Sequence, residues 1–336
     1  MDNKRHTRTV VSRRAVVAGA AAGTVALAGT PASAQRCPPA SPRTKGPLVW
    51  MDLDQLDLDE AYDQSVYAFN QRFLQERRDE RNALMAKVLG KPDRVAYGSA
   101  EIEKVDIYRT KRPNAPTMIF LHGGAWRSGR SAQGAYHAEP FVEAGAHFIN
   151  VEFNNVPETN GDLFAMVDQC RRAVAWVYQN AASFGGDPNT LYLSGFSSGS
   201  HLGGCVVITE WDKQGLPRNI LKGAVLGSGM YDLKPVRMSA RSSYVKFTDE
   251  MEQALSAMRH LDKVHTPLVL TIGLLETPEF QRQSRDFAAA LAKAGKPVQL
   301  VAARGHNHFE MGESLSNPYG IMGRAALEMM GLTGAV

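Results

Sequence analysis

The stretch LYLSGFSSGSHL, residues 191–202, joins an apolar run to three serines and several small residues. Within it, GFSSG (195–199) matches the pattern G-x-S-x-G, in which a nucleophilic serine occupies a sharp turn from a strand to a helix. Glycine is needed two positions before and after that serine, because side chains there would collide across the turn. Only Ser197 meets this condition, since Ser198 and Ser200 lack the flanking glycines. We predict that Ser197 is a nucleophile; the alternative is a turn that only packs a strand against a helix.

A serine hydroxyl needs a base to attack a carbonyl, and the base needs an acid to orient it. Both partners are expected downstream, the acid before the histidine. Glu276 directly follows the apolar run LVLTIGLL and is the preferred acid, with Glu279 as its competitor. The alternative role for Glu276 is that of an acidic residue at a helix start. The segment GHNHF (305–309) offers two histidines, His306 and His308, and the residues alone leave the base open between them.

The segment HGGAW, residues 122–126, follows another apolar run. Cleavage of an ester or amide places negative charge on the carbonyl oxygen, and backbone N–H groups aimed at that oxygen stabilise it. Glycines allow the backbone to approach and turn its N–H groups inward. We predict that the N–H groups of Gly124, Ala125 and Ser198 form this oxyanion hole. His122 is expected to support the loop rather than transfer protons.

A substrate pocket is expected beside these groups. Candidate pocket residues are Gly123, Trp126, Asn154, Tyr231 and His306. For Trp126, packing within its own loop is the favoured alternative. Residues 231–255 are long enough for only a small lid over the pocket.

From about residue 101 onward, apolar β-type runs alternate with helical patterns. Strands are predicted at residues 105–110, 117–123, 146–154, 190–196, 224–230, 267–275 and 298–305. Helices are predicted near residues 163–184, 198–210, 278–294 and 317–331, with one or two amphipathic helices within 54–89. Strands separated by helices favour an α/β fold, with a mostly parallel central sheet and helices on both faces.

The N-terminal segment, residues 1–34, has the pattern of an export signal. Basic residues and the pair Arg13-Arg14 precede an Ala/Gly/Val-rich run, and small residues at Ala32 and Ala34 suit a cleavage site. Paired arginines before a weakly apolar run are typical of a twin-arginine signal; the alternative is a basic tail. We expect residues 1–34 to be removed, residues 35–50 to be an extended linker, residues 51–336 to form one domain, and the protein to be periplasmic or secreted.

The net charge of +4 for the 336 residues lies entirely in this N-terminal segment. The remainder has 33 basic and 33 acidic residues, which gives no indication of a nucleic-acid partner. No later apolar run is long enough to cross a bilayer, so no membrane insertion of the mature chain is expected. The sequence does not indicate an oligomeric state.

The chain has three cysteines, Cys37, Cys170 and Cys205, whose spacing fits no metal cluster. We expect no metal and no cofactor. Cys170 and Cys205 are expected on neighbouring helices, where they would form a disulfide in an oxidising compartment or remain as buried thiols.

Together, HGGAW, GFSSGSHL, ETPEFQRQSRDF and GHNHFE resemble, in order and spacing, the α/β-hydrolase fold. Within it they resemble the branch of arylformamidases (kynurenine formamidases) and small carboxylesterases, a likeness that extends to residues 61–73 and 95–108. The resemblance implies Ser197 as nucleophile, Glu276 as acid and, from its N-H-F setting, His308 as base. The chain departs from this branch in its export signal and at residues 154–158, NNVPE, where many relatives have Tyr-x-Leu-x-Pro.

Three functions follow from these patterns. The first is an exported serine hydrolase that cleaves a small-molecule carboxylic ester through a Ser-His-Glu triad and an acyl-enzyme. The second is an amidase that uses the same triad on an aryl formamide or anilide. The third is a non-catalytic binding protein of the same fold, which is disfavoured because all three triad residues are present.

Overall fold

The apolar runs form the strands of one large sheet in the computed structural model, which describes residues 43–334. The predictions for residues 1–34 and most of the linker fall outside the described residues. In spatial order, the eight strands are β10 (Val298–Ala303), β9 (Leu268–Gly273), β8 (Leu221–Gly227), β7 (Gly186–Phe196), β5 (Ala115–Leu121), β6 (His147–Val151), β4 (Lys104–Tyr108) and β3 (Asp93–Ala96).

Six neighbouring strands, from β10 to β6, are parallel, whereas β4 is antiparallel to β6 and β3 is antiparallel to β4. The mostly parallel sheet predicted from the sequence is therefore confirmed. Parallel strands end at the same edge of the sheet, so the segments that follow β5, β7 and β9 come together there. These are the segments that carry the predicted site.

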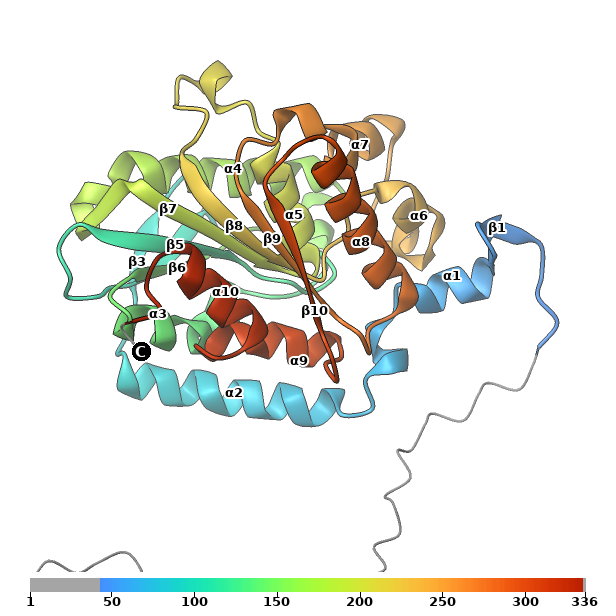
Figure 1. Cartoon of the computed structure of the whole chain (residues 1–336), viewed down its shortest axis with the longest axis horizontal. Coiled ribbons are helices and arrows are strands. Elements are labelled where there is room, and N and C mark those ends of the chain that lie inside the picture. The colour runs from blue at the N-terminus through green and yellow to red at the C-terminus, as the bar shows by residue number, and fades with distance from the viewer. Residues whose placement is uncertain (1–42, 335–336) are drawn as a thin grey trace, which may run out of the picture. The chain divides into compact units, whose positions relative to one another are not determined.

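Helices cover both faces of the sheet, as Figure 1 shows. The helices are α1 (Gln55–Ala61), α2 (Gln71–Val88), α3 (Ala138–Glu143), α4 (Leu163–Asn180), α5 (Ser198–Val207), α6 (Leu233–Met238), α7 (Asp249–Ala254), α8 (Pro278–Lys293), α9 (His308–Glu313) and α10 (Ile321–Met329). Residues of α4, α5 and α8 pack on one face, and residues of α3, α9 and α10 pack on the other.

Alternation along the central strand β5 produces these two cores. Ile119 and Leu121 belong to the core with α4, α5 and α8, whereas Met118 and Phe120 belong to the core with α3 and α10. Successive side chains of a strand point to opposite faces, and both faces are buried here. This explains why the segment reads as an uninterrupted apolar run in the sequence.

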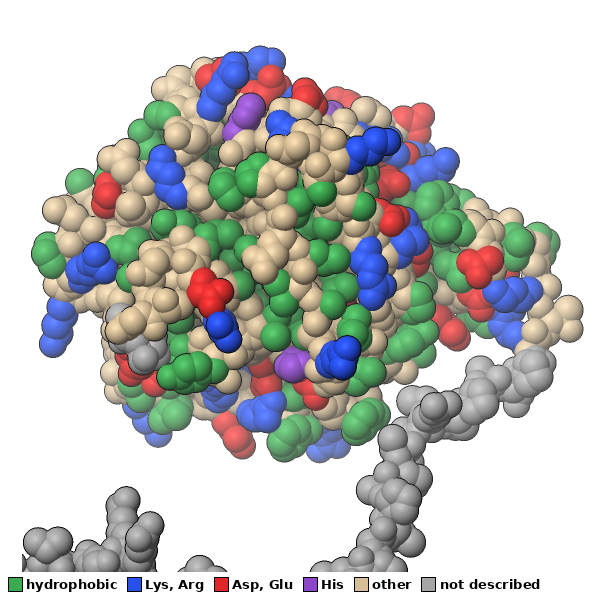
Figure 2. Space-filling view, in the orientation of Figure 1, with side chains coloured by type: hydrophobic (Ala, Val, Ile, Leu, Met, Phe, Trp, Pro, Cys, Tyr) green, Lys and Arg blue, Asp and Glu red, His purple; other side chains and the backbone are tan. Residues whose placement is uncertain are grey.

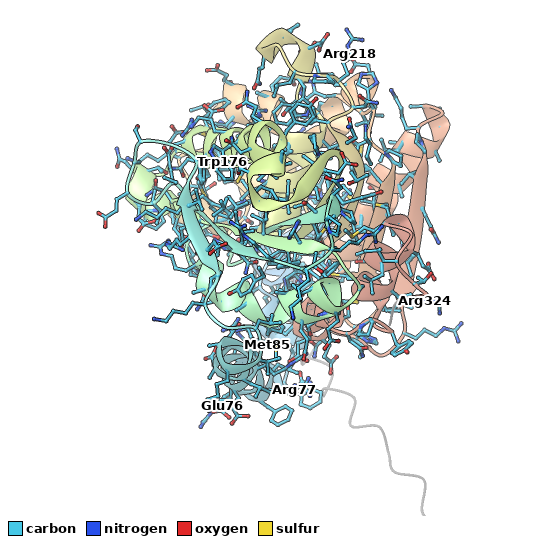
Figure 3. The ribbon with its side chains drawn as sticks, turned by 90° about the vertical axis from the view of Figure 1, so that its left-hand side faces the viewer. Glu76, Arg77, Met85, Trp176, Arg218 and Arg324 are labelled. Atoms are coloured by element: carbon cyan, nitrogen blue, oxygen red, sulfur yellow. The ribbon has the colours of Figure 1, made fainter. Side chains whose placement is uncertain are left out.

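Two short strands and two helices precede the sheet. Strands β1 (Leu48–Trp50) and β2 (Leu53–Asp54) form a small antiparallel pair, so the range predicted as a linker ends in a strand. Helix α1 begins at Gln55, where the Asp54 side chain accepts a hydrogen bond from the N–H of Asp57. Figure 3 shows α2 nearly along its axis, with Met85 on the side facing the domain and Glu76 on the outer side.

The remaining predictions of secondary structure concern the segments between these elements. Residues 231–255, predicted as a lid, contain α6 and α7. None of the helices within residues 43–334 is long and apolar enough to cross a membrane. On the face shown in Figure 2, basic and acidic side chains are interspersed.

Candidate active site

Strand β7 turns into α5 at Ser197, whose φ of 57° and ψ of −123° lie in a region that residues with a side chain rarely adopt. The Ser197 N–H donates to the carbonyl oxygen of Gly227 over 2.9 Å. A Cβ on Gly195 would lie 2.5 Å from the carbonyl oxygen of Gly199. A Cβ on Gly199 would lie 2.1 Å from the carbonyl oxygen of Leu121. The two glycines around the serine are therefore required by the closeness of the backbone.

The side chains of Ser197, His308 and Glu276 lie together at the edge where β7 and β9 end. His308 Nε2 is 2.9 Å from Ser197 Oγ, and His308 Nδ1 is 3.5 Å from Glu276 Oε2. The second distance is long for a hydrogen bond, as is common in catalytic sites without substrate. Glu276 Oε1 accepts hydrogen bonds from Ser228 Oγ (2.5 Å) and the N–H of Gly273 (2.9 Å), which fix the carboxylate. This geometry suits proton transfer from serine to histidine.

His308 is held by the start of α9, where it is the first helical residue. The Asn307 side chain accepts from the N–H groups of Phe309 and Glu310, and the Glu310 carboxylate accepts from the N–H of Asn307. Asn70 joins this capping box by bonds to both side chains, Asn307 (2.7 Å) and Glu310 (2.9 Å). The sequence analysis did not predict this capping box or its bonds to Asn70, although N-x-x-E is a recognisable helix-start pattern.

The two competitors for the roles of base and acid have other partners. His306 is partly exposed, and its Nδ1 lies 3.0 Å from the carbonyl oxygen of Arg304. The Glu279 carboxylate pairs with Arg282 and accepts from the hydroxyl of Tyr62 over 3.0 Å. The structure thus places beside the serine the histidine and the glutamate that the family resemblance implies.

The loop after β5 has the conformation expected of an oxyanion hole. Gly124, Ala125 and Trp126 have φ values of 119°, 54° and 62° in succession. A Cβ on Gly124 would lie 2.0 Å from the carbonyl oxygen of Ser128, so only glycine fits. Within residues 43–334, no acceptor meets the N–H groups of Gly124, Ala125 or Ser198. These three N–H groups are available for the oxygen of a substrate.

Trp126 fastens this loop to α5. Its N–H donates to Ser198 Oγ (3.2 Å), and its indole Nε1–H donates to Nδ1 of His201 (3.2 Å). His201 Nε2 faces the carbonyl oxygen of Leu255 at 3.0 Å, which assigns the proton to Nε2 in the neutral ring. Burial lowers the pKa of His201 to about 4, in keeping with a neutral imidazole. The predicted packing role of Trp126 is the one that the structure shows.

Two further histidines near the site are buried and neutral. Burial lowers the pKa of His122 to about 4 and that of His137 to about 3. The His122 ring stacks on Phe153 with centroids 4.2 Å apart, and its Nδ1 lies 2.9 Å from the carbonyl oxygen of Gly123. His122 therefore supports the loop, as the sequence suggested.

A cavity of about 650 Å³ opens onto Ser197 and His308. Gly123 lines it, and a Cβ there would lie 3.1 Å from the Cβ of Ser197. The sequence did not indicate that Tyr62 and Arg241, from opposite parts of the chain, line it too. The lining comes from segments within residues 59–78, 120–137, 196–197, 239–244 and 308–313.

Four other residues predicted for the pocket lie outside this lining: Trp126, Asn154, Tyr231 and His306. The side-chain oxygen of Asn154 accepts from Gln169 Nε2 over 2.7 Å, which directs the amide toward α4. Tyr231 is fully buried, with its ring stacked on Phe287 at 4.3 Å. The other two make the contacts described above.

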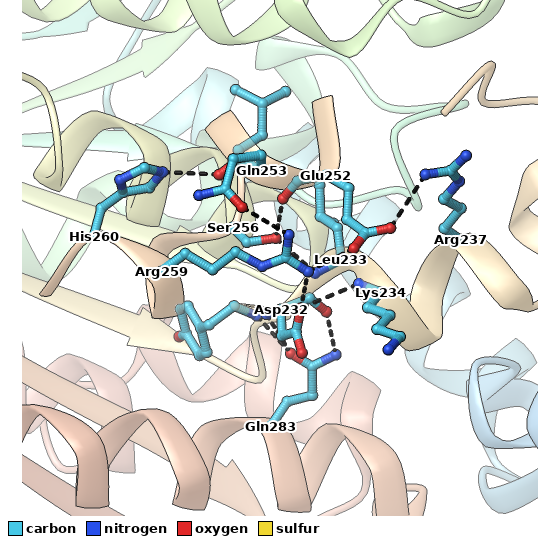
Figure 4. Close-up of polar contacts among 12 residues, drawn as sticks. Asp232, Leu233, Lys234, Arg237, Glu252, Gln253, Ser256, Arg259, His260 and Gln283 are labelled. Atoms are coloured by element: carbon cyan, nitrogen blue, oxygen red, sulfur yellow. Dashed lines mark hydrogen bonds and ion pairs between the residues drawn. The ribbon is translucent and has the colours of Figure 1, made fainter. Parts of the chain in front are cut away.

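The lid segment that contains α6 and α7 is fixed to α8 by polar contacts (Figure 4). Gln283 Oε1 accepts from the N–H groups of both Tyr231 (2.7 Å) and Asp232 (2.8 Å). Arg259 pairs with Asp232 (3.4 Å) and with Glu252 (2.5 Å). The start and the end of the segment are therefore joined to each other and to the body of the domain.

The thiols of Cys170 and Cys205 are free and buried, so these residues form no disulfide. Burial raises the pKa of both thiols, to about 12 for Cys205, which keeps them protonated and unreactive. Among the described residues, no group of histidine, cysteine and acidic side chains is arranged to hold a metal ion.

Comparison with known proteins finds relatives among formamidases and esterases. Residues 105–232, which include Ser197 and the oxyanion loop, match the BD-FAE protein family. Kynurenine formamidase of Danio rerio is 32% identical over 244 residues, which cover 70% of this chain and 81% of that protein. The isoprenylcysteine alpha-carbonyl methylesterase ICME of Arabidopsis thaliana is 24% identical over 241 residues, covering 65% of this chain and 56% of that protein.

Solved structures share the fold at lower identity. A putative thioesterase from a Silicibacter species superposes with a TM-score of 0.68 and 19% identity, covering 82% of this chain and 98% of that one. An esterase from Thermogutta terrifontis superposes with a TM-score of 0.60 and 22% identity, covering 74% of this chain and 94% of that one.

Proposed function

The chain belongs to the α/β-hydrolase family of arylformamidase-like enzymes and carboxylesterases, and from this premise we propose that it hydrolyses a carboxylic ester through a Ser-His-Glu triad. It is a hydrolase of the serine class. The observation that supports the triad most strongly is the 2.9 Å contact between His308 Nε2 and Ser197 Oγ in a strained turn. Because all three side chains are present and adjacent, a purely binding role is disfavoured.

In the first half of the proposed reaction, Ser197 Oγ attacks the substrate carbonyl while His308 Nε2 takes its proton. The negative charge that develops on the carbonyl oxygen is stabilised by the N–H groups of Gly124, Ala125 and Ser198. His308 then returns the proton to the departing alcohol, and the acyl group stays on Ser197. The leaving group departs as a neutral alcohol, so no alkoxide is left in the buried site.

In the second half, water attacks the acyl-enzyme and His308 accepts its proton before passing it to Ser197. Glu276 holds the imidazole in the orientation that both halves need and stabilises the imidazolium that forms transiently. The bonds from Ser228 and Gly273 keep the Glu276 carboxylate in place during both steps.

An aryl formamide is the second candidate substrate, because the Danio rerio relative is a kynurenine formamidase. The same residues serve this reaction, since His308 can protonate a departing amine as it does an alcohol. The test is the comparison of kcat/KM for 4-nitrophenyl acetate and for N-formyl aniline derivatives in the purified protein. Turnover of the ester alone supports the esterase, faster turnover of the formamide supports the amidase, and turnover of neither contradicts both.

We also propose that residues 1–34 direct export of the folded protein and are then removed. The support is the paired arginines, the weakly apolar run and the small-residue cleavage site in the sequence. Replacing Arg13 and Arg14 by lysine is expected to keep the protein in the cytoplasm at its full length. Unchanged export of that double variant would contradict a twin-arginine signal.

A further inference from the structure

The active-site cavity contains a buried guanidinium that has no carboxylate partner. Arg241 lines the cavity and is only 7% exposed. Within residues 43–334, no aspartate or glutamate oxygen lies within 4.0 Å of it, whereas nearby Arg237 and Arg259 are both paired with Glu252. Burying an unpaired charge is costly, so its retention beside a nucleophile indicates a partner that arrives with the substrate.

Neutral groups hold the Arg241 guanidinium without cancelling its charge. Its Nη1 donates to the hydroxyl of Tyr244 (3.2 Å), and its Nη2 donates to the carbonyl oxygen of Tyr62 (3.0 Å). A guanidinium has five N–H donors, so these two bonds leave three unused. The buried Nε is one of them and has no acceptor. Planar N–H groups of this kind are suited to a carboxylate, which accepts two of them side by side.

Aromatic rings surround the same guanidinium. Its central carbon lies 5.4 Å from the ring of Trp126, 5.9 Å from that of Tyr62 and 6.0 Å from that of Phe280. Aromatic faces attract a cation and exclude water from it, so the charge stays strong inside the cavity. The cavity therefore contains a buried cation with aromatic rings around it, and two further arginines, Arg78 and Arg127, line the same cavity.

Phe280 also fixes the distance from this charge to the reaction centre. The ring of Phe280 lies edge-on to His308, with centroids 5.1 Å apart, and it also neighbours Arg241 and the ring of Tyr62. One aromatic ring thus separates the guanidinium from the catalytic imidazole. The ring of Trp126 likewise lies between the guanidinium and the oxyanion loop, because Trp126 contacts Arg241 and directly follows the oxyanion residue Ala125. A substrate of about the size of a substituted benzene spans the two points.

The backbone that carries Arg241 is held in place before any ligand binds. The Arg241 N–H donates to Ser239 Oγ (3.3 Å), and its carbonyl oxygen accepts from the N–H of Val245 (3.0 Å). The N–H of Ala240 donates to the carboxylate of Asp59 (2.6 Å), which ties the segment to α1. A charge that is fixed in advance loses little freedom on binding an anion.

Other charged side chains also line the cavity, namely Asp59, Glu60, Asp63, Arg78, Arg127 and Glu313, and Glu313 pairs with Arg77. Glu60 and Asp63 line the cavity but are exposed, so water screens them. Asp59 is engaged with Ala240 and Gln55. None of these carboxylates is within ion-pair distance of Arg241, which leaves its charge available to a ligand.

We propose that Arg241 is a substrate-binding residue that recognises a carboxylate on the ester or formamide attacked by Ser197. The proposal rests on the proposed function and narrows it to anionic substrates with an aromatic or similarly sized spacer. The carboxylate takes two unused N–H groups of the guanidinium, and the spacer packs against Tyr62, the one of the three rings that lines the cavity. The scissile carbonyl then lies at Ser197, with its oxygen toward the N–H groups of Gly124 and Ala125.

The test compares 3- and 4-acetoxybenzoate with the matching acetoxybenzamides, which have the same shape without the charge. The wild-type protein is expected to show a kcat/KM at least about tenfold higher for one of the acids than for its amide, because a buried cation rejects a ligand that cannot pair with it. In Arg241→Gln this ratio is expected to fall to about one, and in Arg241→Lys to an intermediate value. The control Arg237→Gln, whose guanidinium is paired outside the cavity, is expected to keep the wild-type ratio.

Ratios near one for both pairs in the wild-type protein overturn the proposal, as does a high ratio that survives in Arg241→Gln. If Arg241→Gln does not fold, inhibition of the wild-type protein decides: stronger competitive inhibition by benzoate than by benzamide supports the site, and equal inhibition refutes it. Hydrolysis of the acetate ester of the neutral acetoxybenzamides by the wild-type protein tests the proposed function separately. A protein that hydrolyses them without preferring the acids retains its assigned chemistry and loses only this inference.

Discussion

Replacing His201 by phenylalanine tests whether the contact between Trp126 and α5 holds the oxyanion loop. Phenylalanine keeps the ring and its edge-on contact with Trp126, where the centroids are 5.0 Å apart, but removes both hydrogen bonds. The buried indole N–H of Trp126 then has no acceptor, and the carbonyl oxygen of Leu255 keeps only a weak 3.4 Å bond from Cys205. Each unpaired buried group costs about 1–3 kcal/mol, so we expect a loss of about 3 kcal/mol of stability.

Activity is expected to fall as well, because Trp126 directly follows the oxyanion residue Ala125. A misplaced oxyanion donor costs about 3 kcal/mol of transition-state stabilisation, which limits the loss in kcat to about a hundredfold. Urea unfolding measures the stability, and hydrolysis of 4-nitrophenyl acetate measures kcat. A double-mutant cycle with Trp126→Phe isolates the energy of the pair.

The control is His306→Phe, because the His306 ring is partly exposed and its Nδ1 lies 3.0 Å from a backbone carbonyl oxygen, that of Arg304. It is expected to change stability by less than about 0.5 kcal/mol. The reasoning is refuted if His201→Phe loses less than about 1 kcal/mol and retains the wild-type kcat. It is also refuted if the cycle gives no coupling between the two residues.

Three further predictions concern the turn, the acid and pH. Gly199→Ala places a Cβ 2.1 Å from the carbonyl oxygen of Leu121 and is expected to abolish turnover, whereas Gly46→Ala, with space around it, leaves turnover unchanged; equal activity would contradict the crowding. Glu276→Gln is expected to lower kcat about 10³- to 10⁴-fold with little change in KM, and a loss below tenfold would remove Glu276 from the triad. Burial lowers the pKa values of His122, His137 and His201, so these histidines bind protons at a higher pH in the unfolded chain than in the folded protein. Stability should therefore fall from pH 6.5 toward about pH 4, by about 3 kcal/mol for each histidine. Urea midpoints equal at pH 7 and pH 4.5 would contradict this.

Local patterns predicted the sheet because its inner strands, such as β5, β6 and β9, are buried on both faces. The run TMIFLHG and the strand β5 coincide closely, and the seven predicted strands all appear in the sheet. Strand β3 was missed because its residues, DRVA, are mostly exposed and carry no apolar run. The short helices α3, α6, α7 and α9 were missed because each has only six residues, too few to show a helical period.

The site residues that depend on local backbone geometry could be predicted from the sequence, whereas those that depend on contacts between distant segments could not. The glycines around Ser197 and in the oxyanion loop leave a direct mark on the sequence, because the backbone there admits no side chain. Arg241 leaves no such mark, since its role depends on Tyr62 and Phe280 from distant segments. Tyr231 was predicted for the pocket from its position in the lid, but packing on α8 turns it into the core.

The central claim is that Ser197 is the nucleophile activated by His308. Treatment of the purified protein with a serine-directed fluorophosphonate, followed by mapping of the adduct by mass spectrometry, tests it most directly. We predict one adduct, on Ser197, with loss of esterase activity in proportion to labelling. Ser197→Ala is expected to form no adduct, and His308→Ala is expected to form one much more slowly. Labelling of another residue, or full turnover by a protein that the reagent does not label, would contradict the proposed mechanism.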